Sequence, residues 1–424
     1  MPFAGEGVRR TKKSFGIYLD KDYLGRVIDI FGNYIDGYFK EEINENNFIY
    51  SSIESDILGI IERKAISESL VTGIISIDCI IPIGKGQRQL FVGSRGIGKT
   101  TTLIDIMINQ KENNVICIYV GIAQKQSDIA LIKSKLEENN ALDNCIILCS
   151  DAGKTAINHY LSPYVGITIA EYFSRIKKQD VLIIYDDLSN HAIAYRELNL
   201  LIKNSPTREA YPADVFYSHS KLLERAGSFI NYGSITAFPV VQLQEDDITA
   251  YIPTNLISIT DGQVFFDTKL FNSGIFPAIN TELSVSRICG SAQSKLIRNL
   301  SKSLRLDLAQ YHENSAFSQF GGDLEEETKN KLKKGDVLIE LLTQPLSKIY
   351  SIADQAIILF LFKFYSDKVQ EIKNLKEFIF WIIDYFKKVY KNVYLILKSG
   401  KEVDLINENE IKKIIEEAFL INNY

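Results

Sequence analysis

The sequence has little histidine, cysteine, methionine or tryptophan, and this scarcity excludes several kinds of site. Its 424 residues include four His, five Cys, two Met and one Trp. No two histidines are spaced i,i+4, so the zinc motif that places two His on one helix face is absent. Cys145 and Cys149 are spaced C-x₃-C, but no second ligand pair lies nearby, and a metal site is not expected. Four of the cysteines lie in apolar, strand-like runs, which indicates buried, reduced thiols.

Long hydrophobic runs are absent too. The nearest, Ala356–Phe362, ends at Lys363 and is far shorter than the roughly 20 residues that a membrane span needs, so it predicts a buried helix. The segment Met1–Lys13 is basic but has no apolar core, which excludes a secretory signal and makes a weak mitochondrial presequence. A net charge of −5 gives no indication of a nucleic-acid partner.

The remaining composition is that of a globular protein. Hydrophobic residues make up 46% and charged residues 24%, and the length is sufficient for two or three domains with cores of their own. The chain is rich in Ile, Asn, Lys and Tyr, a bias that indicates an AT-rich coding genome such as that of an organelle or a reduced bacterium.

Residues 93–100 read Gly-Ser-Arg-Gly-Ile-Gly-Lys-Thr, a complete G-x-x-x-x-G-K-T phosphate loop. It follows a strand-like stretch, Gln89–Gly93, and precedes a segment with helical spacing of apolar residues, Thr101–Asn109. In such a loop, backbone N–H groups surround phosphate oxygens, the lysine reaches the β- and γ-phosphates, and the threonine ligates Mg²⁺. The alternative, a glycine-rich turn with an unrelated lysine, is much less consistent with this context. The predicted nucleotide-binding residues are Gly93, Arg95, Gly96, Gly98, Lys99, Thr100 and Thr101.

An apolar strand that ends in two carboxylates supplies the second part of the predicted site. Asp180–Asp187 reads Asp-Val-Leu-Ile-Ile-Tyr-Asp-Asp, the pattern of a buried strand that delivers an aspartate to the phosphate end of a sheet. We expect Asp186 to hold Mg²⁺ together with Thr100, directly or through water. For Asp187 the readings stay open: a further carboxylate of the site, the N-cap of the next helix, or a solvated carboxylate of a turn.

Hydrolysis would also need a group that orients or deprotonates the attacking water. In P-loop ATPases of this shape a glutamate commonly serves, at the end of the strand after the P-loop helix. That strand is Val115–Val120 here, and the corresponding position is Gln124. An amide can bridge to a water but cannot accept its proton. Either Gln124 orients a water, or the site binds nucleotide without turnover.

The order of patterns along the chain predicts an α/β domain followed by helices. Short strands between turns are expected from Phe15 to Ile83. From about Gln87 to Ser286 strands alternate with helices, which implies a mostly parallel sheet covered on both faces. The expected strands are Gln89–Val92, Val115–Val120, Cys145–Cys149, Asp180–Tyr185, Ile235–Val241 and Gly262–Phe266, and the expected helices between them Ser127–Leu136, Ile157–Lys177 and His191–Ile202. Amphipathic helices follow at Lys295–Gln310, Thr328–Leu332, Ala353–Tyr365 and Lys373–Tyr390. The predicted divisions are a linker or severed end (1–15), a nucleotide-binding domain (16–292) and a helical C-terminal domain (293–424).

Together with these motifs, a series of short stretches resembles the α subunits of F-type ATP synthases, from about Leu24 to Gln344. The stretches, in chain order, are Leu24–Asn33, Pro82–Arg88, Ile184–Ser189, Arg208–Pro212, Ala250–Asn255, Ile259–Gln263, Ser284–Arg287 and Ala316–Gly321. The resemblance is to α rather than β, because Gln124 stands where the catalytic β subunit has its glutamate.

The resemblance implies a RecA-like P-loop domain, a site that holds Mg·ATP or ADP without turnover, and a subunit that alternates with catalytic β subunits in a hexamer. Arg287, in Ser-Val-Ser-Arg, matches the arginine finger that reaches into the neighbouring β site. A guanidinium there would offset charge developing on the γ-phosphoryl group. From the residues alone, Arg287 reads as an ordinary salt-bridge residue.

The resemblance also implies contacts outside the nucleotide sites. Residues Gln319–Asp323 match the loop that faces the central γ rotor. The resemblance also implies a peripheral stalk as part of the proton-driven complex. The chain itself would be associated with a membrane only as part of this complex. The implied location is the matrix side of the mitochondrial inner membrane or, alternatively, the cytoplasmic face of a bacterial plasma membrane.

Departures from the family pattern affect the base pocket and the N-terminal end. Phe276, before Pro277, stands where the family has an arginine, and Gln344-Pro-Leu346 stands where the family has Gln-Gly-Gln. One contact to the nucleotide base is therefore expected to be lost at Leu346. Phe276, Pro277 and Gln344 remain predicted residues of the pocket. The β-barrel domain that precedes Leu24 in the family is missing from this sequence. We expect either that a separate N-terminal α fragment supplies it or that the sequence is incomplete at its start.

Two alternatives stay open. One is a self-sufficient hexameric RecA-like motor, such as a Rho-like helicase or a secretion ATPase, which would need a catalytic glutamate near residue 124 and, for RNA, a basic or aromatic binding module. The other is an α homologue with a task other than ATP synthesis.

Overall fold

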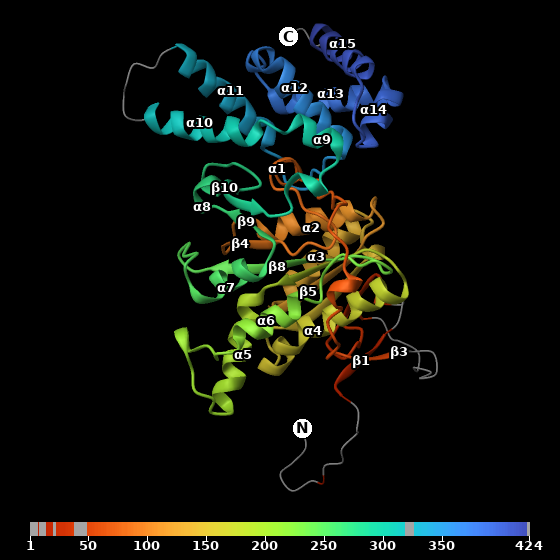
Figure 1. Cartoon of the computed structure of the whole chain (residues 1–424), viewed down its shortest axis with the longest axis vertical. Helices are drawn as coiled ribbons and strands as arrows, with labels where there is room; N and C mark the ends of the chain where they lie inside the picture. The colour runs from red at the N-terminus through yellow and green to blue at the C-terminus, as the bar shows by residue number, and fades with distance from the viewer. Residues whose placement is uncertain (1–6, 8–13, 20–22, 38–48, 319–325, 422–424) are drawn as a thin grey trace.

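The computed structural model describes Gly7 and residues 14–19, 23–37, 49–318 and 326–421. The predicted linker at 1–15 lies outside this part of the chain except for Gly7, Ser14 and Phe15, and so does the predicted rotor-facing loop Gln319–Asp323. The sheet and its helices occupy the middle of the molecule and the C-terminal helices one end (Figure 1).

An eight-stranded sheet forms the centre of the molecule, in the order β10-β9-β4-β8-β7-β5-β6-β2. All neighbouring strands are parallel except β10 and β9, which are antiparallel. The strands are β2 (Arg26–Ile28), β4 (Leu90–Ser94), β5 (Ile116–Gln124), β6 (Cys145–Asp151), β7 (Val181–Asp186), β8 (Ile235–Leu243), β9 (Gly262–Phe266) and β10 (Ile279–Ser286). A separate antiparallel pair joins β1 (Gly16–Leu19) to β3 (Ile49–Ser52).

The sheet is buried on both faces because apolar residues continue through each strand without polar alternation. In β7, Leu182 and Ile184 pack into one core, while Val181, Ile183 and Tyr185 pack into the other. The first core is shared with α2 (Lys99–Gln110) and α3 (Gln126–Glu138). The second is shared with α4 (Ala156–Glu171), α5 (Leu188–Leu201), α6 (Val215–Leu223) and α7 (Tyr251–Ile259). Near-continuous apolar strands between two helix layers are typical of a parallel sheet, as predicted.

In the part of the chain that the structure describes, seven α-helices follow the sheet and confirm the predicted helical C-terminal part. They are α9 (Lys295–Leu300), α10 (Leu304–Ser318), α11 (Glu326–Leu342), α12 (Ile352–Gln370), α13 (Leu375–Lys388), α14 (Lys391–Lys398) and α15 (Leu405–Ile421). The apolar run Ala356–Phe362 lies buried in α12, as expected. None of the helices in the described ranges is both long and apolar enough to cross a bilayer. The change from sheet to helices falls between Ser286 and Lys295, and the predicted domain bounds remain predictions.

Several predicted elements were wrong in extent or type. The single helix expected at Lys295–Gln310 is broken at Ser301, which caps α9 through its N–H to the Ile297 carbonyl. The short helix expected at Thr328–Leu332 extends over 17 residues as α11. Within it, Gly335 packs so closely on the Tyr311 ring of α10 that a Cβ atom would lie 2.1 Å from that ring. Strand β10 was not predicted.

The strand-like run before Ile83 contains a short helix instead, α1 (Ile75–Ile80). Another short helix, α8 (Thr268–Asn272), follows β9. The reason at α1 is local. Asp78 accepts hydrogen bonds from the N–H groups of Thr72 and Gly73, at 2.9 Å each, which folds the chain back into a turn before the helix.

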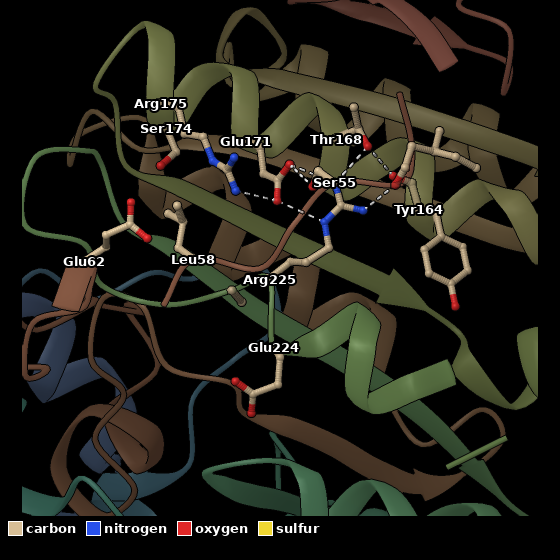
Figure 2. Close-up of polar contacts among 12 residues, drawn as sticks. Ser55, Leu58, Glu62, Tyr164, Thr168, Glu171, Ser174, Arg175, Glu224 and Arg225 are labelled. Carbon is tan, nitrogen blue, oxygen red and sulfur yellow. Dashed lines mark hydrogen bonds and ion pairs between the residues drawn. The ribbon is translucent and has the colours of Figure 1, made fainter. Parts of the chain in front are cut away.

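A buried ion pair joins three segments on the face of the sheet opposite α2. Arg225, directly after α6, donates to both carboxylate oxygens of Glu171 in α4, at 3.0 and 2.8 Å (Figure 2). The guanidinium also donates to the Ile53 carbonyl and to the Thr168 hydroxyl, and Ser55 donates to Glu171 at 2.9 Å. This arrangement fixes residues 53–55 against α4 and α6.

Candidate functional site

The phosphate loop connects β4 to α2 in the conformation that the motif requires. Gly96 and Gly98 have φ of 80° and 94°, in the left-handed region that favours glycine, and α2 begins at Lys99 directly after Gly98. The first N–H groups of α2 therefore face the loop. A helix N-terminus of this kind carries a partial positive charge and suits an anion.

Gly93, at the start of the loop, is required by close packing. A Cβ atom at this position would lie 2.8 Å from the Phe266 carbonyl oxygen and 2.7 Å from Ile97 Cδ1. Gly93 is buried and does not line the cleft, so its contribution is to bring the loop backbone close to β9.

The Lys99 side chain bends back into the loop. Its Nζ donates to the carbonyl oxygens of Gly93, at 2.6 Å, and of Ser94. Burial lowers the pKa of Lys99 to about 8, although the nearby carboxylates of Asp186, Asp187 and Asp246 act in the opposite direction. The Lys99 side chain is therefore held inside the loop, and the three carboxylates offset only part of the effect of burial on its pKa.

Asp186 ends β7 and collects hydrogen bonds from two neighbouring elements. Its Oδ2 accepts from the Thr100 hydroxyl at 2.9 Å and from the Tyr119 hydroxyl of β5 at 2.7 Å. Burial raises the pKa of Asp186, while both hydroxyl groups and Lys99 oppose this. Tyr119 was not predicted as a site residue, because the sequence of an apolar strand does not indicate that one of its side chains contacts a carboxylate on a neighbouring strand.

Asp187 is the N-cap of α5, one of the readings left open for it. Its Oδ1 accepts from the Asn190 N–H at 2.7 Å. Burial and the adjacent Asp186 raise the pKa of Asp187 to about 7. Its carboxylate also lines the cleft, so the cap lies at the edge of the site.

Gln124, at the end of β5, faces the same strand end. Its Nε2 donates to the main-chain carbonyl oxygen of Asp186 at 3.1 Å. The register of β5 and β7, in which Gly121 pairs with Asp186, brings the two together. A carboxylate at this position could not donate this hydrogen bond.

At the other end of the cleft two aromatic rings meet. Phe271 of α8 and Phe276 lie edge to face, with ring centroids 5.5 Å apart and planes at 87°. Leu346, whose side chain is 55% exposed, lines the cleft beside them. Pro277 is not among the lining residues.

The structure places Gln344 away from the cleft, where its amide is bound inside the protein. Its Oε1 accepts from the Ile75 N–H at 3.0 Å, and its Nε2 donates to the carbonyl oxygens of Gly73 and Lys348. Gln344 is only 2% exposed. It supports the turn at Phe276 instead, because its N–H donates to the Phe276 carbonyl at 2.7 Å.

Arg287 lies at the edge of the sheet opposite the cleft, directly after β10, because β10 runs antiparallel to β9 and its last residue, Ser286, pairs with Gly262 at the start of β9. Its backbone N–H is bound to the Asp261 carbonyl, and its guanidinium reaches only the Ile257 carbonyl, at 3.5 Å. The side chain is exposed and forms no ion pair within the described part of the chain. It is therefore available to a partner.

The phosphate loop, the carboxylates and the aromatic wall surround one cleft. Of the predicted nucleotide residues it brings together all except Gly93, Pro277 and Gln344. The cleft is lined by Arg95, Gly96, Gly98, Lys99, Thr100, Thr101, Ala123, Gln124, Lys125, Asp128, Ala152, Asp186, Asp187, Asn190, Gln242, Phe271, Phe276 and Leu346.

These residues fit a nucleoside triphosphate with its metal. The loop backbone, Lys99 and the α2 N-terminus are donors suited to phosphate, and the two aromatic rings provide an apolar wall for a base. Thr100 and Asp186 present two oxygens, the ligand type that Mg²⁺ prefers.

Comparison with known proteins covers nearly the whole chain. Residues 73–286 match the model of the ATP synthase alpha/beta family, nucleotide-binding domain, and residues 293–418 that of the ATP synthase alpha/beta chain, C terminal domain. An ATP synthase subunit alpha of Carsonella ruddii is 46% identical over 431 residues, which cover 99% of this chain and 87% of the relative. The ATP synthase subunits alpha of two Helicobacter pylori strains are 45% identical over 417 residues, 97% of this chain and 82% of each relative. All three relatives are bacterial, so the mitochondrial location expected from the sequence has no support.

Proposed function

Because the chain belongs to the ATP synthase alpha/beta family and is similar over nearly its full length to α subunits, we propose that it is the non-catalytic, Mg·ATP-binding subunit of a rotary F-type ATP synthase. It alternates with catalytic β subunits in a hexamer around a γ rotor. The complex is held by a peripheral stalk at the cytoplasmic face of a bacterial-type membrane.

The observation that carries this proposal is the hydrogen bond from Gln124 to the Asp186 carbonyl. The amide occupies the place of the general base and is held by a donor contact to the main chain. It cannot accept a proton from water at neutral pH. The cleft therefore has the groups that bind phosphate and metal but no base in the position where the family's catalytic subunit has one.

Each part of the site has a role in binding. Thr100 and Asp186 would hold Mg²⁺, which when bound screens the charge of the phosphates. Lys99 and the loop N–H groups bind phosphate oxygens, and Phe271 and Phe276 contact the base. ADP would be retained by the same residues.

The exposed guanidinium of Arg287 supports a role in a neighbouring subunit. A permanently charged, planar side chain without an ion pair of its own can meet several phosphate oxygens of a catalytic site across the interface. We therefore assign Arg287 as the arginine finger of the β site.

Purification of the full chain, alone and with a β subunit, tests this function. We expect the chain alone to bind ATP in the presence of Mg²⁺ without measurable phosphate release, and the complex with β to hydrolyse ATP. Multiple turnovers by the chain alone would contradict the proposal and favour a self-sufficient motor. A Gln124→Ala variant that still binds ATP would show that the amide is not required for binding.

A further inference from the structure

At the end of the cleft where the nucleotide base is expected, the lining side chains are apolar, so they can stack on a base but cannot form hydrogen bonds with it. On the assumption that the proposed nucleotide site is correct, we propose that it does not discriminate between purine nucleotides and binds GTP about as well as ATP. Three features of the structure carry this inference: the composition of the base wall, the bonding of the polar groups beside it, and the position of the other polar side chains in the sheet.

The base wall is apolar. It consists of Phe271, Phe276 and Leu346, and the two rings support each other edge to face at 5.5 Å. Both rings are half-buried and Leu346 is exposed, so part of each side chain remains open to the cleft. Such a surface attracts any purine, because every base has a π face.

The polar groups next to this wall are already bound within the protein. Both ends of the Gln344 amide are used, by Ile75, Gly73 and Lys348. The Phe276 carbonyl accepts from the Gln344 N–H.

The turn that carries Leu346 is likewise held from within. The Ser347 N–H donates to the Asp105 carboxylate of α2, at 3.2 Å. Asp105 is buried, and this bond fixes the turn to the phosphate-loop helix. The Ser347 N–H, next to Leu346, is thereby bound to α2 and is not free for a ligand.

The sheet order separates the base wall from the remaining polar lining. The phosphate loop follows β4, and β4 lies between β9 and β8. Phe271 and Phe276 follow β9, on one side of the loop. The polar residues that do not belong to the loop or α2 follow β5, β7 and β8, on the other side: Gln124, Lys125, Asp128, Asp186, Asp187, Asn190 and Gln242. Among the lining residues outside the loop and α2, the polar side chains thus lie on the other side of the loop from the two rings.

The consequence is energetic. A site that hydrogen-bonds a distinguishing group can reject an analogue by a factor of about 10⁴–10⁵, whereas a surface that only stacks has no such means. Adenine and guanine differ in the donors and acceptors of their edges and hardly at all in stacking area. We expect the dissociation constants for Mg·GTP and Mg·ATP to differ by less than about tenfold.

Equilibrium binding of Mg·ATP and Mg·GTP to the full chain, measured by isothermal titration calorimetry, tests the inference. A ratio of dissociation constants below about tenfold supports it, and a larger ratio overturns it. A Lys99→Ala variant separates this question from the proposed function. If that variant binds both nucleotides as tightly as the wild type, the nucleotide is not in the predicted site, and both the inference and the site assignment fail.

A second variant tests the stacking wall itself. Phe276→Leu keeps an apolar side chain but removes the ring, and we expect it to weaken ATP and GTP by the same factor, about tenfold. Phe216→Leu, which changes an exposed side chain of α6, is the matched control and should change neither. A Phe276→Leu variant that weakens only one of the two nucleotides would overturn the inference, because it would show that this wall distinguishes bases.

Discussion

The Thr100 hydroxyl donates a hydrogen bond of 2.9 Å to Oδ2 of Asp186, and this contact joins the first turn of α2 to the end of a strand that lies two positions away from β4 in the sheet. The same oxygen accepts from Tyr119 at 2.7 Å. Two residues that are 86 positions apart in sequence thus form the oxygen pair expected to hold Mg²⁺.

Asp186→Asn should remove most of the contribution of Mg²⁺ to ATP affinity. The substitution keeps the shape of the side chain but removes its charge, and we expect the gain in affinity on adding Mg²⁺ to fall by about 10–100-fold. Titrations with and without the metal measure this. Asp187→Asn is the matched control, because asparagine is an equally good N-cap, and it should retain most of the gain. Equal losses in both variants would contradict a specific metal role for Asp186.

Nucleotide affinity should fall as the pH rises above about 8. Burial lowers the pKa of Lys99 to about 8, and a bound phosphate would raise it, so binding takes up a proton at alkaline pH. Below pH 8 Lys99 is already charged, and the affinity should be constant. Above pH 8 it should decrease by up to about tenfold per pH unit. Lys99→Arg stays charged, and its profile should be flat whatever its affinity. A wild-type profile that is flat to pH 10 would contradict the role of Lys99.

Arg287→Ala should abolish ATP turnover by the complex with β while assembly and nucleotide binding persist. Removal of one charge-stabilising group from a phosphoryl-transfer site costs about 10³–10⁵-fold in rate. Arg287→Lys should restore little, since an ammonium lacks the planar fork. The rate of phosphate release and the elution volume of the complex are the two readouts. Arg298→Ala, on α9, is the control and should keep its rate. Unchanged turnover in Arg287→Ala would disprove the finger.

The free energy of unfolding should decrease between pH 6.5 and 4 because of a buried histidine pair. His191 Nε2 lies 3.2 Å from the Tyr160 carbonyl oxygen, which can only accept, so this nitrogen carries the proton. His191 Nδ1 then accepts from His219 Nε2 at 3.1 Å, and both rings are neutral. Burial lowers the pKa of His219 to about 4 and that of His191 well below its ordinary value.

The unfolded chain binds more protons than the folded chain in this pH range. The contribution of the neutral histidines to the free energy of unfolding is therefore fully present above pH 6.5 and is lost as the pH falls toward 4. For His219 this loss is about 3 kcal/mol. The rings of Tyr160 and Tyr164 face His191, and no carboxylate is among the groups that shift its pKa. Chemical denaturation at pH 7 and 5 checks this. His219→Gln keeps the donor and should reduce the difference, while His312→Gln should not. An unchanged difference in His219→Gln would contradict the assignment.

Arg225→Met should destabilise the chain by about 3–5 kcal/mol, because it leaves the Glu171 carboxylate buried without its partner. Arg175→Met provides the comparison. Arg175 also donates to Glu171, at 3.1 Å, but it is 27% exposed, and its loss should cost less than about 1 kcal/mol. Urea titrations of the two variants measure the difference, and equal effects would contradict the distinction between the buried and the exposed pair.

Much of the fold and the phosphate end of the site could be predicted from the sequence, because their signals are local. Six of the strands were predicted from apolar runs of a few residues, and the loop from eight consecutive residues. Asp186 followed from its place at the end of such a run. Gln124 was located by counting from the loop to the end of the next strand. In a parallel sheet the carboxyl ends of strands meet at one edge, so these residues had to lie together.

The base end could not be predicted in the same way. Gln344 belongs to the predicted pocket by its position in sequence, yet its amide is bound by residues of a segment about 270 positions earlier, as the Ile75 and Gly73 contacts show. Whether a polar side chain faces a ligand or the protein depends on which partners the fold brings to it.

The sequence by itself therefore determined the family, the phosphate loop, the strand that delivers Asp186 and the absence of a glutamate at residue 124, since each is written in a contiguous stretch. The tertiary structure alone decided which groups are buried and paired. The lowered pKa values of Lys99 and His219 arise from packing between distant segments. So does the exposed position of the Arg287 guanidinium, which forms no ion pair among the described residues. Desolvation acts on a side chain through everything that surrounds it, and those surroundings exist only once the chain has folded.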